Sequence, residues 1–165
     1  MLLALAGCTT SPPPLVLPPA AASLDPDPVR AAIRGAQAAF ADPAALAGRP
    51  REAAVAVAQL EFLSVEIMAG RTSIDLSGII GPALEAARHE VRGQLGIPDS
   101  APPQAVIDAL LAEPPALAQP AIFTLGPEET LRRLSSLPRL PQANAATLAA
   151  RTDMEFGPMD IDTAR

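Results

Sequence analysis

The chain has 165 residues, a formal net charge of −6 and an apolar content of 49%, with alanine as the largest part. This length allows one domain with a modest core, and the negative charge argues against nucleic acid or an anionic surface as a partner. The single cysteine excludes an intrachain disulfide and a cysteine metal site, and the body lacks the run of about 18 apolar residues that a membrane span needs.

The N-terminal residues resemble the lipid-attachment signal of bacterial lipoproteins. Leu5-Ala6-Gly7-Cys8 supplies the apolar residue, the two small residues and the cysteine of a lipobox. No basic residue and few apolar residues precede it, so residues 1–7 are expected to be a truncated signal peptide. The resemblance implies that Cys8 is lipidated and anchors the protein in the cell envelope. Thr9 follows Cys8 where some lineages place an aspartate for inner-membrane retention, which by analogy implies the outer membrane, with the body facing the periplasm.

Residues 8–27 are rich in proline and alanine and include the lipidated N-terminus. Proline favours extended backbone, and such a composition is typical of a semi-rigid spacer without a core of its own. We therefore expect a disordered tether that lifts the body off the membrane so that it can meet a partner.

Residues 28–151 are expected to form an all-α, irregular bundle of about six helices with proline-marked connections. Residues 116–126 fit either a loop or a short extended piece. Residues 152–165 are expected to be a loosely ordered acidic tail. The first helix is expected to begin near Pro28, after a cap from Asp25 or Asp27, and a short turn follows at Pro43–Leu46. The next expected element is a long helix, Arg51–Ala69. The remaining helices are expected from Pro82 to Leu95, from Pro103 to Pro114, from Pro127 to Pro138 and over Gln142–Arg151.

The helix expected over Arg51–Ala69 is apolar around most of its circumference, which is typical of a central core helix. Its polar stripe is Glu52, Gln59 and Glu66, spaced seven residues apart. Glu61 lies opposite that stripe, where a core helix would carry an apolar group. Two interpretations stay open for it: a buried acid that faces a pocket, or an ion pair with an arginine. The candidate partners are Arg34, Arg71 and Arg88.

His89 is the only histidine, and Glu85 lies one helical turn before it. The two residues are either a proton-handling or metal-binding pair or, as we favour, part of a solvated face with Arg88 and Arg92. We expect no metal, no cofactor and no catalytic residue. With one histidine and no tyrosine, tryptophan or lysine, the chain has few groups for catalysis. We therefore expect that the protein is not an enzyme.

Three hypotheses for the function follow. The first is a lipid-anchored scaffold or protein-interaction module of the cell envelope, held to a membrane by its N-terminal lipid. The second is a carrier or sensor of an apolar small molecule, because alanine-rich helices leave room for a pocket. The third is a soluble cytosolic helical protein without lipidation.

Overall fold

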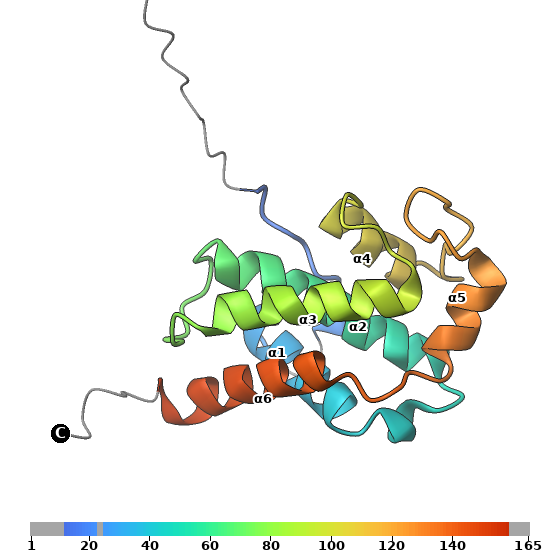
Figure 1. Cartoon of the computed structure of the whole chain (residues 1–165). Coiled ribbons are helices and arrows are strands. Elements are labelled where there is room, and N and C mark those ends of the chain that lie inside the picture. The colour runs from blue at the N-terminus through green and yellow to red at the C-terminus, as the bar shows by residue number, and fades with distance from the viewer. Residues whose placement is uncertain (1–11, 23–24, 159–165) are drawn as a thin grey trace, which may run out of the picture.

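The computed structural model describes residues 12–22 and 25–158 of the chain (Figure 1). These residues form α-helices and short 3-10 helices with no strand among them, so the expected all-α bundle is confirmed. In chain order the elements are η1 (Pro19–Ala21), α1 (Pro28–Ala41), η2 (Pro43–Leu46), α2 (Pro50–Met68), α3 (Ile80–Leu95), α4 (Pro103–Leu111), α5 (Pro127–Leu134) and α6 (Pro141–Phe156).

Every α-helix of the described residues except α3 begins at a proline; α2 and α6 begin at Pro50 and Pro141, one residue before their expected starts. Proline suits the first turn because its missing N–H has no partner there in any case. The carboxylate of Asp27 caps α1 by accepting the backbone N–H of Val29 at 2.8 Å. Helix α3 begins at Ile80, before the expected Pro82, because the Ile80 side chain is buried in the core. It ends at Gly96, which has a left-handed φ of 66°.

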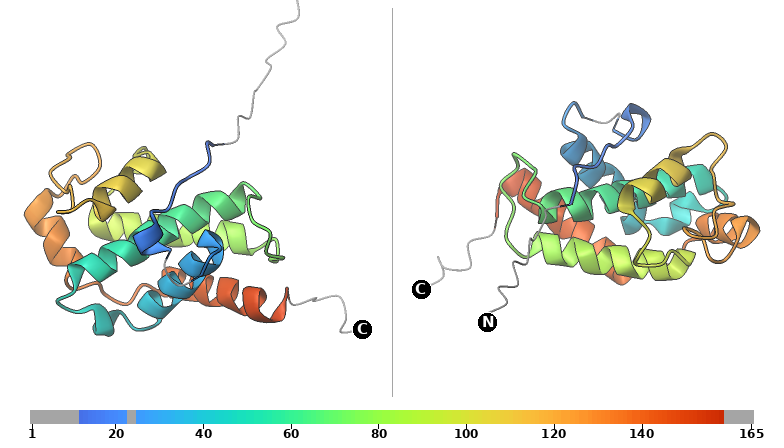
Figure 2. Two further views of the ribbon diagram at one scale, coloured as in Figure 1. Left: turned by 180° about the vertical axis from the view of Figure 1, so that it is seen from behind. Right: turned by 90° about the horizontal axis from the view of Figure 1, so that it is seen from above.

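Helix α2 lies at the centre of the bundle and packs against α1, α3 and α4, while α6 packs against α1 and α3 (Figures 1 and 2). Burial covers almost all of α2 between Ala53 and Glu66, which confirms the prediction of a central core helix. Fully buried alanines such as Ala32, Ala58 and Ala143 stand on three of these helices. Such small side chains let helix axes approach closely, although each buries little surface.

Helix α6 continues to Phe156, past the predicted end at Arg151. The cause is Asp153, which is buried and accepts both the backbone N–H and the hydroxyl of Ser77, at 2.8 and 2.6 Å. These bonds attach the last turns of α6 to the loop between α2 and α3. The prediction that a loose tail begins after Arg151 is therefore wrong, while residues 159–165 lie outside the described residues.

Residues 116–126, between α4 and α5, form turns rather than an extended piece. Ile122 and Phe123 pack into the core from this connection. The N–H and the hydroxyl of Thr124 both donate to the carbonyl of Gly96, at 3.0 and 2.8 Å. The connection therefore covers the end of α3.

Candidate functional site: a docked N-terminal segment beside an alanine-lined pocket

Residues 12–22, here called the N-terminal segment, lie along the polar stripe of α2. The backbone N–H of Leu15 donates to Glu66 Oε1 at 2.8 Å, and Gln59 Nε2 donates to the carbonyl of Ala21 at 2.8 Å. Gln59 and Glu66 are consequently only 4% and 6% exposed, whereas Glu52, the third member of the stripe, is exposed. The polar stripe faces the chain's own N-terminal segment along two of its three positions.

Arg71, just beyond the end of α2, joins the segment to the stripe. Its guanidinium donates to both carboxylate oxygens of Glu66, from Nε at 2.9 Å and from Nη2 at 2.8 Å. Nη1 donates to the carbonyl of Pro12 at 2.9 Å. Because proline has a carbonyl but no N–H, a proline-rich segment needs donors from the body, and Arg71 supplies one.

Glu66 is held in its charged form by these neighbours. Burial acts to raise the pKa of Glu66, but the hydrogen bonds from Arg71 and from the Leu15 N–H, with the charge of Arg71, more than offset it. The pKa of this carboxyl therefore lies below its usual value. The same pairing raises the pKa of Arg71.

The remainder of the N-terminal segment is fixed by apolar burial and by α4. Leu17 and Ala21 belong to the buried core. The side-chain amide of Gln104 accepts the N–H of Val16 at 2.8 Å and donates to the carbonyl of the same residue at 3.1 Å. The prediction of a disordered tether over residues 8–27 is therefore wrong for residues 12–22. Local composition favoured a spacer, but backbone and side-chain contacts with α2 and α4 order it.

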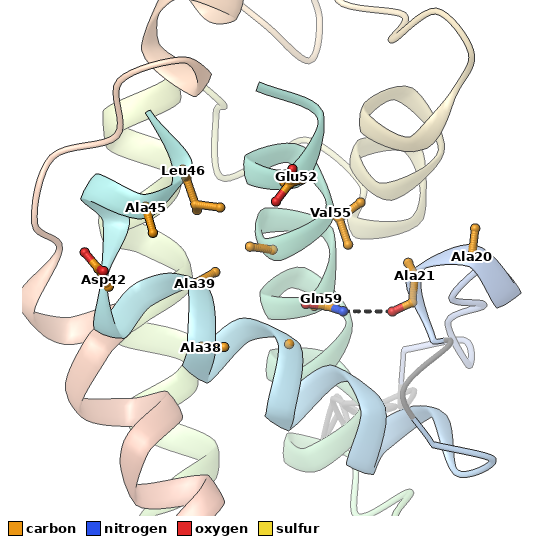
Figure 3. Close-up of a pocket in the computed structure, with 12 residues that line it drawn as sticks. Ala20, Ala21, Ala38, Ala39, Asp42, Ala45, Leu46, Glu52, Val55 and Gln59 are labelled. Carbon is orange, nitrogen blue, oxygen red and sulfur yellow. Dashed lines mark hydrogen bonds between the residues drawn. The ribbon is translucent and has the colours of Figure 1, made fainter. Parts of the chain in front are cut away.

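A pocket of about 450 Å³ opens beside the segment, between α1, η2 and α2 (Figure 3). Half of its lining residues are alanine, and no basic side chain of the described residues contributes to it; Asp42 and Glu52 supply its acidic groups. Gln59 lies where the pocket meets the N-terminal segment and holds Ala21 in place (Figure 3). Gly35 leaves room for this side chain, since a Cβ on that residue would come within 2.7 Å of Gln59 Cδ and the amide would have to shift.

Glu61 is buried, as one of its two interpretations required, and it forms an ion pair. Its carboxylate accepts Arg92 Nε at 2.7 Å and Nη2 at 2.8 Å, while Arg88 Nη1 lies 3.9 Å away. Of the three partners considered from the sequence, only Arg88 lies near. The main partner, Arg92, was expected on a solvated face and is 1% exposed instead.

Arg92 also bonds the loop that follows α3. Its Nη1 donates to the carbonyls of Pro98, Asp99 and Ala101, at 2.9, 3.2 and 3.1 Å. The guanidinium therefore connects α2, α3 and the start of the α4 region at one buried point. These contacts leave Glu61 engaged in structure, and it does not line the pocket of Figure 3.

His89 lies on the surface between two acidic side chains. Its Nδ1 is 2.8 Å from Asp99 Oδ1, and its Nε2 is 3.4 Å from Glu85 Oε1. Within the described residues, no group of three or more histidine, cysteine, aspartate or glutamate side chains is placed to hold a metal ion.

Comparison with protein-family models, with curated proteins and with solved structures found no match. The part of the chain that the structure describes contains no helix long and apolar enough to cross a membrane. Cys8, the expected lipidation site, lies outside the described residues.

Proposed function

We propose that the protein is a lipid-anchored helical protein of the cell envelope that acts as a scaffold or protein-interaction module. The observation that supports this proposal most is the lipobox-like Leu5-Ala6-Gly7-Cys8, followed closely by a segment that is bonded to the central helix. A lipid on Cys8 would therefore be attached four residues before a segment that contacts the body of the protein. We further propose the outer membrane and its periplasmic face as the location, and a role without catalysis.

The proposal is tested by metabolic labelling with a palmitate analogue in a bacterial host that lipidates such signals. The wild-type chain and the Cys8→Ser variant are each expressed behind the same complete signal sequence. We expect label and membrane fractionation for the wild type and neither for Cys8→Ser, because the thiol is the acceptor of the lipid. Equal labelling of the two proteins would remove the anchor and favour the unlipidated cytosolic alternative.

The pocket favours a second candidate function, the carriage or sensing of an apolar small molecule. Its volume of about 450 Å³ lies within the range of about 300–1,000 Å³ that is typical of ligand pockets. Its alanine lining and acidic rim suit an apolar molecule that is neutral or carries an amine, since an anion would meet Asp42 and Glu52.

This second function is tested with N-phenyl-1-naphthylamine, an uncharged apolar amine whose emission rises in apolar surroundings. Ala39, which is partly buried, lines the pocket, so Ala39→Phe should fill it and abolish the emission gained by the wild type. The matched control is Ala149→Phe, a change at a partly buried alanine of α6 outside this pocket. Equal emission from Ala39→Phe and the wild type would count against carriage in this pocket.

A further inference from the structure

Three large apolar side chains are exposed at one end of the bundle, where α2 and α6 end and α3 begins (Figure 1). They are Met68, the last residue of α2, Ile79, which precedes α3, and Phe156, the last residue of α6, and they are 54%, 68% and 82% exposed. These three residues are called the apolar end below. Single exposed apolar residues are ordinary on protein surfaces, but a group of them marks an interaction site.

Contacts among the elements that carry the apolar end hold its members together. Met68 lies against the start of α3, because a Cβ added to Gly81 would be 3.4 Å from Met68 Cγ. Asp153 binds Ser77 at 2.8 and 2.6 Å, which places the last turn of α6 next to the loop that carries Ile79. The three side chains therefore stand on elements that are fixed to one another.

The N-terminal segment starts at this same end. Pro12 accepts a hydrogen bond from Arg71 at 2.9 Å, and Arg71 is three residues beyond Met68. Cys8 precedes Pro12 by four residues, which span at most about 14 Å when fully extended. Any lipid on Cys8 is consequently held close to the apolar end.

We propose that the apolar end lies against the bilayer that holds Cys8, with Met68, Ile79 and Phe156 in its interfacial layer. This inference rests on the lipid anchor proposed above. Apolar side chains of surface-bound proteins enter the headgroup boundary by about 5–10 Å. Because only four residues connect Cys8 to Pro12, the body is held close enough to the bilayer for its exposed side chains to reach this depth. The expectation that the tether lifts the body away from the membrane is replaced by a body that rests on it.

Charge at the apolar end favours a zwitterionic surface. Arg71 is paired with Glu66, so its charge is balanced within the protein. Asp75 is exposed nearby, and Glu155 is exposed while pairing with Arg151 at 2.9 Å. Attraction to anionic lipid is therefore not the driving force, and the contact depends on apolar burial with the anchor keeping the local concentration high.

The chain offers a clean experiment because it has no tryptophan and one cysteine. The full chain is attached through Cys8 to phosphatidylcholine vesicles that contain a maleimide lipid, so the result does not depend on lipidation in cells. Ile79→Trp and Phe156→Trp place a fluorophore at the apolar end. The matched control is Leu131→Trp, on α5 at the far end of the bundle, where the native leucine is 44% exposed (Figure 1).

With brominated lipids in the vesicles, we expect quenching and a blue shift for Ile79→Trp and Phe156→Trp, and neither for Leu131→Trp. The unattached double variant Cys8→Ser, Ile79→Trp should show no quenching, because three side chains bind weakly without an anchor. Absent quenching at both 79 and 156, or equal quenching at 131, would overturn the proposal. Equal labelling of the wild type and Cys8→Ser in cells would concern the anchor alone, so failure of the anchor and failure of the bilayer contact are distinguishable.

Discussion

Replacement of Arg92 by methionine should lower the free energy of unfolding by about 3–5 kcal/mol, the cost of removing one partner from a buried ion pair. Methionine keeps much of the side-chain volume but leaves the Glu61 carboxylate buried without its two donors at 2.7 and 2.8 Å. The carbonyls of Pro98, Asp99 and Ala101 lose their donor as well. Because whole domains are stable by only about 5–15 kcal/mol, this loss takes a large share of the total.

Urea unfolding followed by far-ultraviolet circular dichroism measures this loss, since the chain lacks tryptophan and tyrosine. The control is Arg132→Met, which removes an arginine with a 65% exposed side chain that pairs with Glu129, and it should leave the unfolding midpoint nearly unchanged. The double variant Glu61→Leu, Arg92→Met should recover part of the loss, because no charge then stays buried alone. An Arg92→Met midpoint equal to that of Arg132→Met would contradict a structural role for the pair.

The helices could be predicted because proline and helical spacing are local signals. Five of the six α-helices of the described residues begin at a proline, within one residue of the expected start, and the central position of α2 follows from its apolar circumference. The end of α6 could not be placed in this way, because its last turns depend on Asp153 accepting two hydrogen bonds from Ser77. That partner lies 76 residues earlier in the chain.

The same limit explains the errors at the candidate site. Periodicity indicates which face of a helix is polar, but it does not say whether water or another part of the protein meets that face. The spacing placed Gln59 and Glu66 on a polar stripe without indicating what meets it, and the N-terminal segment covers them. For Arg92, spacing on its own helix suggested a solvated face, whereas the partner that buries it is Glu61 on α2.

Replacement of Glu66 by alanine should loosen the N-terminal segment while leaving the bundle folded. The change removes the carboxylate that accepts the Leu15 N–H and that binds the Arg71 guanidinium. Hydrogen bonds to charged groups contribute about 1.5–3 kcal/mol, and the lower value, suited to a partly solvated site, corresponds to about tenfold more opening. Amide hydrogen exchange should show this as about tenfold lower protection of Leu15 and Val16, with core amides of α3 unchanged.

Glu52→Ala is the matched control, because Glu52 stands on the same stripe of α2 but is exposed and pairs with Arg49. It should leave the protection of the N-terminal segment at the wild-type level. If Glu66→Ala also left it there, the carboxylate would not be what holds the segment.

Acid should loosen the wild-type segment in the same way. Because the pKa of Glu66 is lowered in the folded protein, its contribution is complete above the unfolded value of about 4.3 and disappears as pH falls through the lower folded value. Protection of Leu15 should therefore fall as the pH is lowered in the wild type but not in Glu66→Ala.

A segment released as far as Pro28 would lengthen the connection from Cys8 to the body from about 14 Å to about 70 Å. On vesicles, the tryptophan of Ile79→Trp should then lose quenching only in the fraction of molecules whose segment is released, because a body on a long connection no longer rests against the bilayer. Glu66→Ala raises that fraction, while Leu17, Ala21 and Gln104 still hold the segment in the other molecules.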